Sequence, residues 1–174
     1  MKRTPDYGFT LIELLIVVAI ISIIAAFAVP GLLQAKMTAN EASAITALKA
    51  TGAAQVSYST SCGNGAYATS FLVLGASPTA EGQPFISADL GLSVTPQKSG
   101  YNLAMTAGAA GAGPNDCVGR PTNSGYYVTA VPQTFGSTGT RSFSMNAGNT
   151  IWQNTSAEPP PEPFTSSATI GPIR

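Results

Sequence analysis

The longest hydrophobic run in the chain extends from Phe9 to Val29 and contains one charged residue, Glu13. A helix of about 20 apolar residues spans the roughly 30 Å hydrocarbon core of a bilayer, so this run is predicted to cross a membrane once. Lys2 and Arg3 precede it. Because basic flanks stay on the cytoplasmic side, we expect a cytoplasmic N-terminus and export of the remaining chain.

Two helical patterns follow one another without a turn signal. We assign the apolar helix to residues 9–30 and an amphipathic continuation to residues 31–58, where apolar positions recur every three or four residues and form a stripe suited to a sheet. The stripe comprises Ile45, Leu48, Gly52 and Val56. The opposite face comprises Lys36, Asn40, Lys49 and Gln55.

Strand patterns come after a long irregular segment. Residues 59–100 contain repeated glycine and proline turn signals, which predicts a connection with short elements, of which 71–74 and 85–92 are apolar enough to dock on the core. Three or four antiparallel strands are predicted within residues 101–152. They cover residues 101–107, 126–131, 141–145 and 151–152.

This order of elements predicts an α+β fold, with a long helix packed on one face of an antiparallel meander and solvent on the other face. Residues 153–174 form a tail rich in Pro, Ser and Thr. Its proline run is expected to be stiff and extended, to join no strand ladder and to be a solvated extension, with a role in surface recognition as the alternative.

Composition limits the classes of function. The chain has 174 residues, of which 9% are charged, and its formal net charge is zero, so no basic field favours nucleic acid. Lys98, Arg120 and Arg141 are scattered and are interpreted as solvated surface charges. The exported part has the size of one ordinary domain.

Candidate catalytic chemistry is sparse. The chain contains no His, which excludes imidazole-based catalysis and metal sites, and its two cysteines lack metal-ligand spacing. The glycine-rich segment 108–113 leads into Pro114 and not into a helix, so it is interpreted as a hairpin loop and not a phosphate loop. Asp116 alone is too little for a calcium site. We therefore predict no enzyme, no cofactor and no metal.

The two cysteines are Cys62 and Cys117, and both lie in the part of the chain predicted to be exported. Because exported proteins meet an oxidising compartment, we predict a disulfide between them, worth about 4 kcal/mol in the chain-entropy picture. Two unpaired buried thiols are the alternative.

Glu13 is out of place in an apolar run. A carboxylate in hydrocarbon costs roughly 2.5 to 3.5 kcal/mol on insertion scales, so it predicts a cationic partner, and the apolar run contains none. The small residue Gly8 before Phe9 suits a processing site. Cleavage there leaves an ammonium group at Phe9, one helical turn from Glu13, which places opposite charges at matching depths on neighbouring copies.

A short basic leader ending in Gly8, followed by Phe9-Thr10-Leu11-Ile12-Glu13 at the start of an apolar helix, resembles the type IV pilin and pseudopilin family. The resemblance implies a pilin-like fold and removal of residues 1–8 by prepilin peptidase. It also implies N-methylation of Phe9 and pairing of Glu13 with the Phe9 amine of an adjacent subunit. The implied location is the bacterial inner membrane, and then an extracellular or periplasmic filament.

Two positions within the helix qualify the resemblance. Ser22 stands where many family members have a Gly that loosens the helix. Pro30 removes a backbone donor and clashes with the preceding turn, so a kink or break is expected near residues 26–30. Many pilins place their disulfide near the C-terminus, and the predicted bridge differs from that arrangement.

The function predicted from these features is that of a structural subunit of a type IV pilus-like filament, a homo-oligomer built with the pilus assembly machinery. The alternatives are a pseudopilin or minor pilin of a type II secretion or competence machine, and a monomeric, membrane-tethered binding domain. An ordinary secretory signal peptide fits less well, because Val29-Pro30-Gly31 is a poor cleavage site. A plain single-pass anchor does not account for Glu13.

Overall fold

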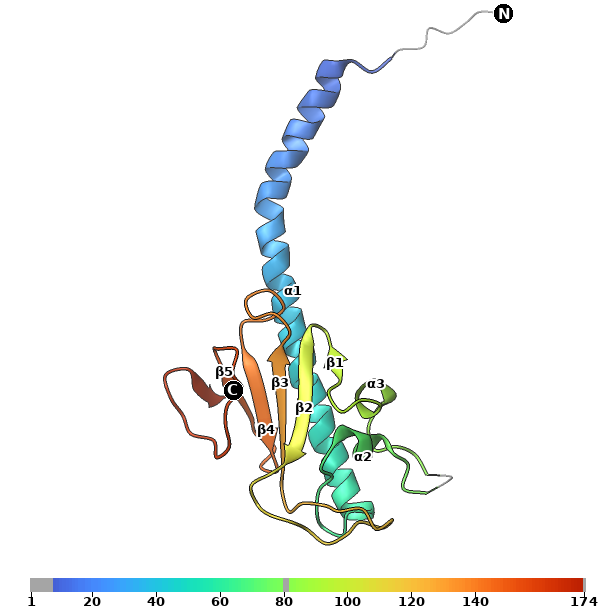
Figure 1. Ribbon diagram of the computed structural model, residues 1–174. Helices are drawn as coiled ribbons and strands as arrows, with labels where there is room; N and C mark the ends of the chain where they lie inside the picture. The colour runs from blue at the N-terminus through green and yellow to red at the C-terminus, as the bar shows by residue number, and fades with distance from the viewer. Residues whose placement is uncertain (1–7, 80–81, 174) are drawn as a thin grey trace, which may run out of the picture. The chain divides into compact units, whose positions relative to one another are not determined.

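The computed structural model describes residues 8–79 and 82–173 and contains three helices and one sheet in that part of the chain (Figure 1). The chain forms two compact units, Met1–Lys36 and Met37–Arg174, and the long helix α1 contributes to both. The helices are α1 (Leu11–Ser61), α2 (Phe71–Gly75) and α3 (Ala88–Gly91). The strands are β1 (Gln97–Lys98), β2 (Tyr101–Ala107), β3 (Tyr126–Pro132), β4 (Ser142–Asn146), β5 (Ile151–Asn154) and β6 (Ile170–Pro172).

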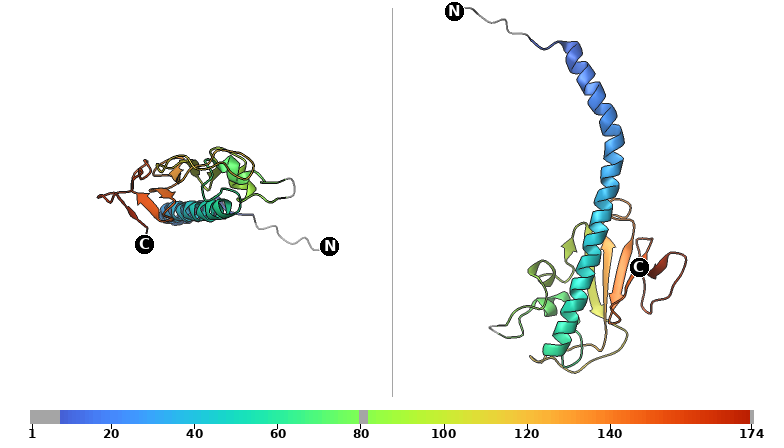
Figure 2. Two further views of the ribbon diagram at one scale, coloured as in Figure 1. Left: turned by 90° about the horizontal axis from the view of Figure 1, so that it is seen from below. Right: turned by 180° about the vertical axis from the view of Figure 1, so that it is seen from behind.

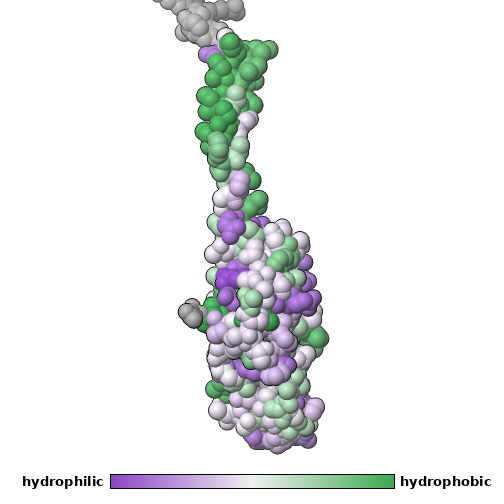
Figure 3. Space-filling view, turned by 90° about the vertical axis from the view of Figure 1, so that its left-hand side faces the viewer, coloured by the Kyte–Doolittle hydropathy of each residue, from purple (hydrophilic) through white to green (hydrophobic). Residues whose placement is uncertain are grey.

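The first unit consists, in its described residues, of the apolar part of α1. This helix is long and apolar enough to cross a membrane. Hydrophobic side chains cover its visible face in Figure 3. α1 continues without interruption through Pro30, so the predicted break is wrong, whereas a kink stays a prediction. The hydroxyl of Ser22 donates to the Val18 carbonyl at 2.7 Å, so it adds no unsatisfied polar group to the helix.

The second unit is built on a six-stranded antiparallel sheet in the order β1-β2-β3-β4-β5-β6, so each strand pairs with its sequence neighbours. The predicted meander is confirmed, and the four predicted strands correspond to β2 through β5. The predicted count of three or four strands is wrong, because β1 and β6 were missed. They have only two and three residues, respectively, and too few positions to show an alternating pattern.

The second half of α1 lies across one face of this sheet (Figure 2). Leu48 and Tyr58 of the helix are fully buried in one core with Tyr101, Val128 and Phe143 of the strands. The predicted faces of the helix are wrong at Gln55 and Val56.

Gln55 is fully buried on the sheet side, whereas Val56 is 45% exposed. The Gln55 side chain donates to the Ala68 carbonyl at 2.8 Å and accepts from the Ala68 N–H at 2.9 Å. Both polar ends of the amide are therefore satisfied, which removes the main cost of burying it.

The opposite face of the sheet is left to solvent only in part: Asn102 and Thr106 of β2 are exposed there, as predicted, but β4 is covered. The segment between β5 and β6, residues 155–169, which we name the C-terminal strap, crosses it. Ser142 and Ser144 of β4 are fully buried, and their hydroxyls donate to the carbonyls of Glu158 at 2.6 Å and Pro160 at 2.9 Å. The prediction of a solvated tail that joins no ladder is therefore wrong. A proline-rich segment cannot donate from its prolines, but its carbonyls accept from serines presented by the sheet.

The connection from α1 to the sheet packs on the same core, as predicted for its apolar segments. Phe71 and Leu74 of α2 and Leu90 of α3 are buried. α2 and α3 approach each other at two glycines: a Cβ on Gly75 would lie 2.5 Å from the Gly91 Cα. Glycine at these positions lets the two short helices cross backbone to backbone.

Candidate functional site

The N-terminal end of α1 is closed by a reciprocal pair of hydrogen bonds between Thr10 and Glu13. The Glu13 N–H donates to the Thr10 hydroxyl oxygen at 3.2 Å, and the Thr10 N–H donates to Glu13 Oε2 at 2.9 Å. The Thr10 hydroxyl also donates to the same carboxylate oxygen at 2.6 Å. This arrangement is a capping box, in which Thr10 is the N-cap and Glu13 the third residue of the helix.

The capping box gives Glu13 a role within its own chain. A helix start leaves backbone N–H groups without partners, and Glu13 satisfies one of them. The signal that indicates this cap in the sequence is Thr-x-x-Glu before an apolar run, and it was missed in the prediction. A plain single-pass anchor can therefore also use Glu13, as a helix cap, contrary to what the sequence predicted.

The residues proposed for processing lie beside this cap. Phe9 is 82% exposed, and a side chain added at Gly8 would meet no atom within 4 Å. Gly8, Phe9 and Glu13 are therefore all accessible in the isolated chain. The remainder of the leader, residues 1–7 with Lys2 and Arg3, lies outside the described residues. No described residue of the first unit supplies a cation beside Glu13.

The apolar surface that follows has no partner in the isolated chain. Its large hydrophobic side chains are about half exposed or more all along the first unit, from Leu11 at 80% to Leu33 at 56%. A helix that is apolar all around has to be covered by lipid or by other protein.

Glu41 anchors the second half of α1 to the turn between β3 and β4. It is buried, and its carboxylate accepts from the Thr140 N–H at 2.8 Å and from Arg141 Nη2 at 2.6 Å. Burial opposes ionisation of Glu41, but the hydrogen bonds from Thr140 and Arg141 outweigh it, so its pKa is lowered. The interpretation of Arg141 as a solvated charge is wrong.

Asp116 forms a second buried cluster, near the end of α1. Its carboxylate accepts from the Tyr58 hydroxyl at 2.8 Å, from Arg120 Nε at 2.7 Å, and from the N–H groups of Val118 and Arg120. Burial of Asp116 raises its pKa, and these donors outweigh that effect and lower the pKa to about 2. Burial and the Asp116 hydrogen bond raise the pKa of Tyr58.

The Asp116 cluster shows that the prediction for Arg120 was wrong, and it shows which groups bind the Asp116 carboxylate. Arg120, predicted to be a solvated charge, is paired with Asp116. Both Asp116 oxygens are occupied by donors of the protein. Among residues 8–79 and 82–173, no group of three or more His, Cys, Asp or Glu is placed to hold a metal ion.

Cys62 and Cys117 form a disulfide, which confirms the prediction. Their Cα atoms are 4.8 Å apart and 55 residues apart in sequence. The Cys117 N–H also donates to the Cys62 carbonyl at 2.7 Å. The bridge joins the end of α1 to the connection between β2 and β3, next to the Asp116 cluster.

Comparison with known protein families gives a match at the N-terminal end of the chain. Residues 3–29 match the prokaryotic N-terminal methylation motif. The chain carries the class III signal peptide motif of type IV pilins. No curated protein and no solved structure matches the chain.

The motif supports a type IV pilin-like or pseudopilin protein, and it implies a structural protein. It also implies processing by prepilin peptidase and contact with pilus assembly machinery. The apolar helix and the motif together fit a protein anchored in the inner membrane. The α+β architecture of the second unit, a helix packed on an antiparallel sheet, agrees with the pilin-like fold that the resemblance implied.

Proposed function

We propose that this protein is a structural subunit of a type IV pilus-like filament, cut between Gly8 and Phe9, methylated at Phe9 and polymerised through the apolar part of α1. The observation that carries the proposal is the combination of a methylation motif over residues 3–29 with an apolar helix whose side chains are exposed all around. In the membrane, lipid covers that surface. In a filament, the same surface of other copies covers it.

In this proposal Glu13 has two roles in succession. Its carboxylate first closes its own helix through Thr10 and then pairs with the Phe9 amine of a neighbouring copy. Carboxylate oxygens accept more than one hydrogen bond, so the two roles are compatible. In a low-dielectric helix bundle, an opposite charge at the same depth lowers the cost of burying Glu13 and sets the register between copies.

Processing is tested by mass spectrometry of the N-terminus together with electron microscopy of filaments sheared from cells. We expect a chain that begins at methylated Phe9 and is abundant in the filaments. A mature protein that still begins at Met1 would overturn the proposal. A processed chain that occurs only in trace amounts within filaments of another subunit would instead favour the minor pilin or pseudopilin alternative.

The role of Glu13 is tested by separating its charge from its capping function. Glu13→Gln keeps a side chain that can close the capping box but removes the charge, whereas Glu13→Ala removes both. If pairing with the Phe9 amine drives assembly, both variants insert into the membrane and both lose filaments. Filaments at the wild-type level in Glu13→Gln, with loss only in Glu13→Ala, would assign Glu13 to the helix cap alone.

A further inference from the structure

The second unit carries unlike apolar features at the two edges of its sheet. On the β1 edge, the connection from α3 to β1 projects Leu92 and Val94, which are 77% and 58% exposed. The residues around them, Ser93 and Thr95, are uncharged. These are the two most exposed large hydrophobic side chains of the described part of the second unit, and we name residues 92–95 the apolar projection.

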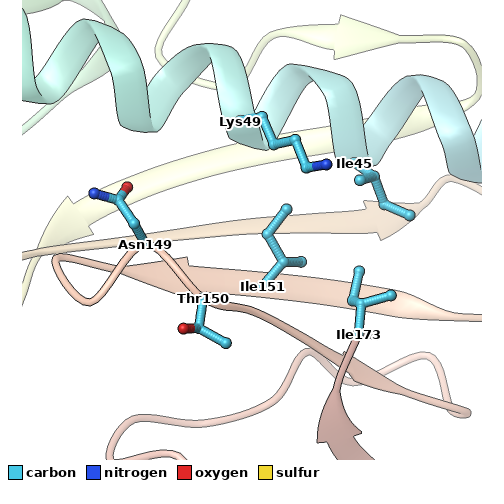
Figure 4. A pocket seen from close by; sticks show the side chains of 6 residues that line it. All are labelled: Ile45, Lys49, Asn149, Thr150, Ile151 and Ile173. Atoms are coloured by element: carbon cyan, nitrogen blue, oxygen red, sulfur yellow. The ribbon is translucent and has the colours of Figure 1, made fainter.

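At the β6 edge there is a groove of about 330 Å³ between α1 and the last two strands (Figure 4). Its lining residues are Ile45, Lys49, Asn149, Thr150, Ile151 and Ile173. Three isoleucines provide its apolar wall. Ligand pockets measure roughly 300 to 1,000 Å³, so this groove is at the small end, where one or two aliphatic side chains fit better than a drug-sized ligand.

A lysine lies beside the groove, and a carboxylate that is in an ion pair with Lys98 lies beside the projection. Lys49 lies on the helix side of the groove (Figure 4) and forms no ion pair with any residue that the structure describes. Asp89 lies in α3, three residues before Leu92, and its side chain is 50% exposed while it pairs with Lys98. An exposed pair of this kind is worth at most about 1 kcal/mol, so Asp89 can also face a second cation.

We propose that the apolar projection of one copy enters the groove of the next copy, with Asp89 of the first facing Lys49 of the second. This inference rests on the proposed filament function. A contact between two different surfaces of one molecule leaves both surfaces available at the ends of any assembly, and it therefore propagates as an open helix when the rotation does not close. The opposite edges of a single sheet meet this requirement, since each copy offers the projection at β1 and the groove at β6.

The contact is tested in the full chain by photo-crosslinking within filaments. A photoreactive amino acid replaces Val94, copies labelled with heavy and light nitrogen are mixed, and crosslinked peptides are sequenced. We expect bonds between different copies, from position 94 to peptides that contain residues 149–151 or 173. Filaments whose crosslinks map elsewhere would overturn the contact and leave the filament function standing. If unsubstituted chains form no filaments, the proposed function itself fails.

A second measurement uses charge. Because Leu92 and Val94 are exposed, Leu92→Asp combined with Val94→Asp should preserve the fold and the Cys62–Cys117 bridge but lower filament yield at least about tenfold, the effect of 1.4 kcal/mol per contact. Leu72→Asp, at an exposed position of α2, is the matched control and should keep the yield. Asp89→Lys should lower the yield, and Lys49→Asp in the same chain should restore it. Unchanged yield in the Leu92 and Val94 variant, or an equal loss in the control, would contradict the contact.

Discussion

At Gly52, the helix and the sheet come too close for a side chain. A Cβ there would lie 2.6 Å from Asn149 Oδ1 and 2.9 Å from Met145 Cε. The sequence pattern placed Gly52 in the apolar stripe of the helix that faces the sheet, and it gave no sign that this position leaves no room for a side chain. The close approach depends on residues almost a hundred positions later, which no local pattern shows.

We therefore expect Gly52→Ala to lower the free energy of unfolding by about 1 to 2 kcal/mol, although Ala is favoured over Gly in helices by about 1 kcal/mol. Denaturant unfolding of the full chain in detergent, followed by the fluorescence of the single tryptophan, Trp152, measures the change. Asn149→Gly in the same chain removes the obstructing oxygen and suits the positive φ of 54° at Asn149, so it should recover part of the loss. A stabilised Gly52→Ala variant would show that the sheet yields at this point.

Asp116 makes stability depend on pH. Its pKa is lowered to about 2 in the folded chain from an ordinary value of 3.8, so folding favours the ionised form. The contribution, about 2 kcal/mol, is fully present above pH 4 and is lost as the pH falls through 2.

The corresponding measurement is the urea midpoint of the wild-type chain and of Asp116→Asn between pH 2 and pH 6. We expect the wild type to be the more stable protein at pH 6 and the gap to narrow toward pH 2. Asp89→Asn is the control, because its ion pair with Lys98 is exposed and its loss should change stability by less than about 0.5 kcal/mol. A difference in urea midpoint that does not change with pH would show that the ionisation of Asp116 does not cause the pH dependence of stability.

At the scale of elements, the structure of the C-terminal strap differs most from the prediction made from its sequence. Ser142 donates to two strap carbonyls and Ser144 to one, and Phe164 of the strap stacks on Trp152 with ring centroids 5.3 Å apart. Glu162 accepts from the Asn146 side chain at 2.8 Å. The strap is therefore held by hydrogen bonds to its backbone and to the Glu162 side chain, and by contacts of Phe164 with the rings of Trp152 and Tyr127.

Replacing both serines, Ser142→Ala with Ser144→Ala, should loosen the strap without unfolding the sheet. Each lost hydrogen bond costs about 1 kcal/mol, so we expect about 2 to 3 kcal/mol less protection of residues 155–169. Limited proteolysis and hydrogen exchange measure this protection, and Trp152 fluorescence reports loss of the Phe164 contact. Thr165→Ala, at an exposed position, is the control. Equal protease resistance in both variants would mean that the serines do not hold the strap.

Elements long enough to show a repeating pattern of hydrophobic and polar residues could be predicted from the sequence. Elements that form only because another segment pairs with them could not. The seven residues of β2 show clear alternation, and the seven of β3 are rich in β-branched and aromatic residues. The strand β6 exists because Asn154 pairs with Ile170 across the strap. The burial of Gln55 depends in the same way on the backbone of Ala68. In each case the deciding contact is made by a distant segment.

At the scale of the whole molecule, the N-terminal site was predictable because its residues are close together in sequence. Gly8, Phe9 and Glu13 were selected from a small residue before an apolar run, from the charge within that run and from the resemblance to pilins, and all three lie within the matched residues 3–29. The hydrogen bonds of Thr10 and the buried pairs of Glu41 and Asp116 were not predicted. An acid and a base brought together across a hundred residues, as in Glu41 and Arg141, leave no trace in a local pattern.

The two-unit organisation predicts that the second unit folds without the first. Its core is formed by residues after Met37, and the exposed side chains before Lys36 contribute none of it. A chain starting at Met37 begins with a new helix end, but Asn40 and Glu41 hold that end to the turn between β3 and β4 through Thr138 and Thr140.

We expect the chain that begins at Met37 to be soluble without detergent, to form the Cys62–Cys117 disulfide and to unfold in one cooperative transition. The full chain needs detergent or lipid, because its apolar helix is exposed all around. Gel filtration and circular dichroism of both proteins make the comparison. Glu41→Ala in the shortened chain should lower its stability by about 1 to 3 kcal/mol, because it leaves Arg141, which keeps its hydrogen bond to Gln153, without its carboxylate partner. If the shortened chain aggregates or does not unfold cooperatively, the first unit contributes to the core. The second unit then does not fold independently of residues 1–36.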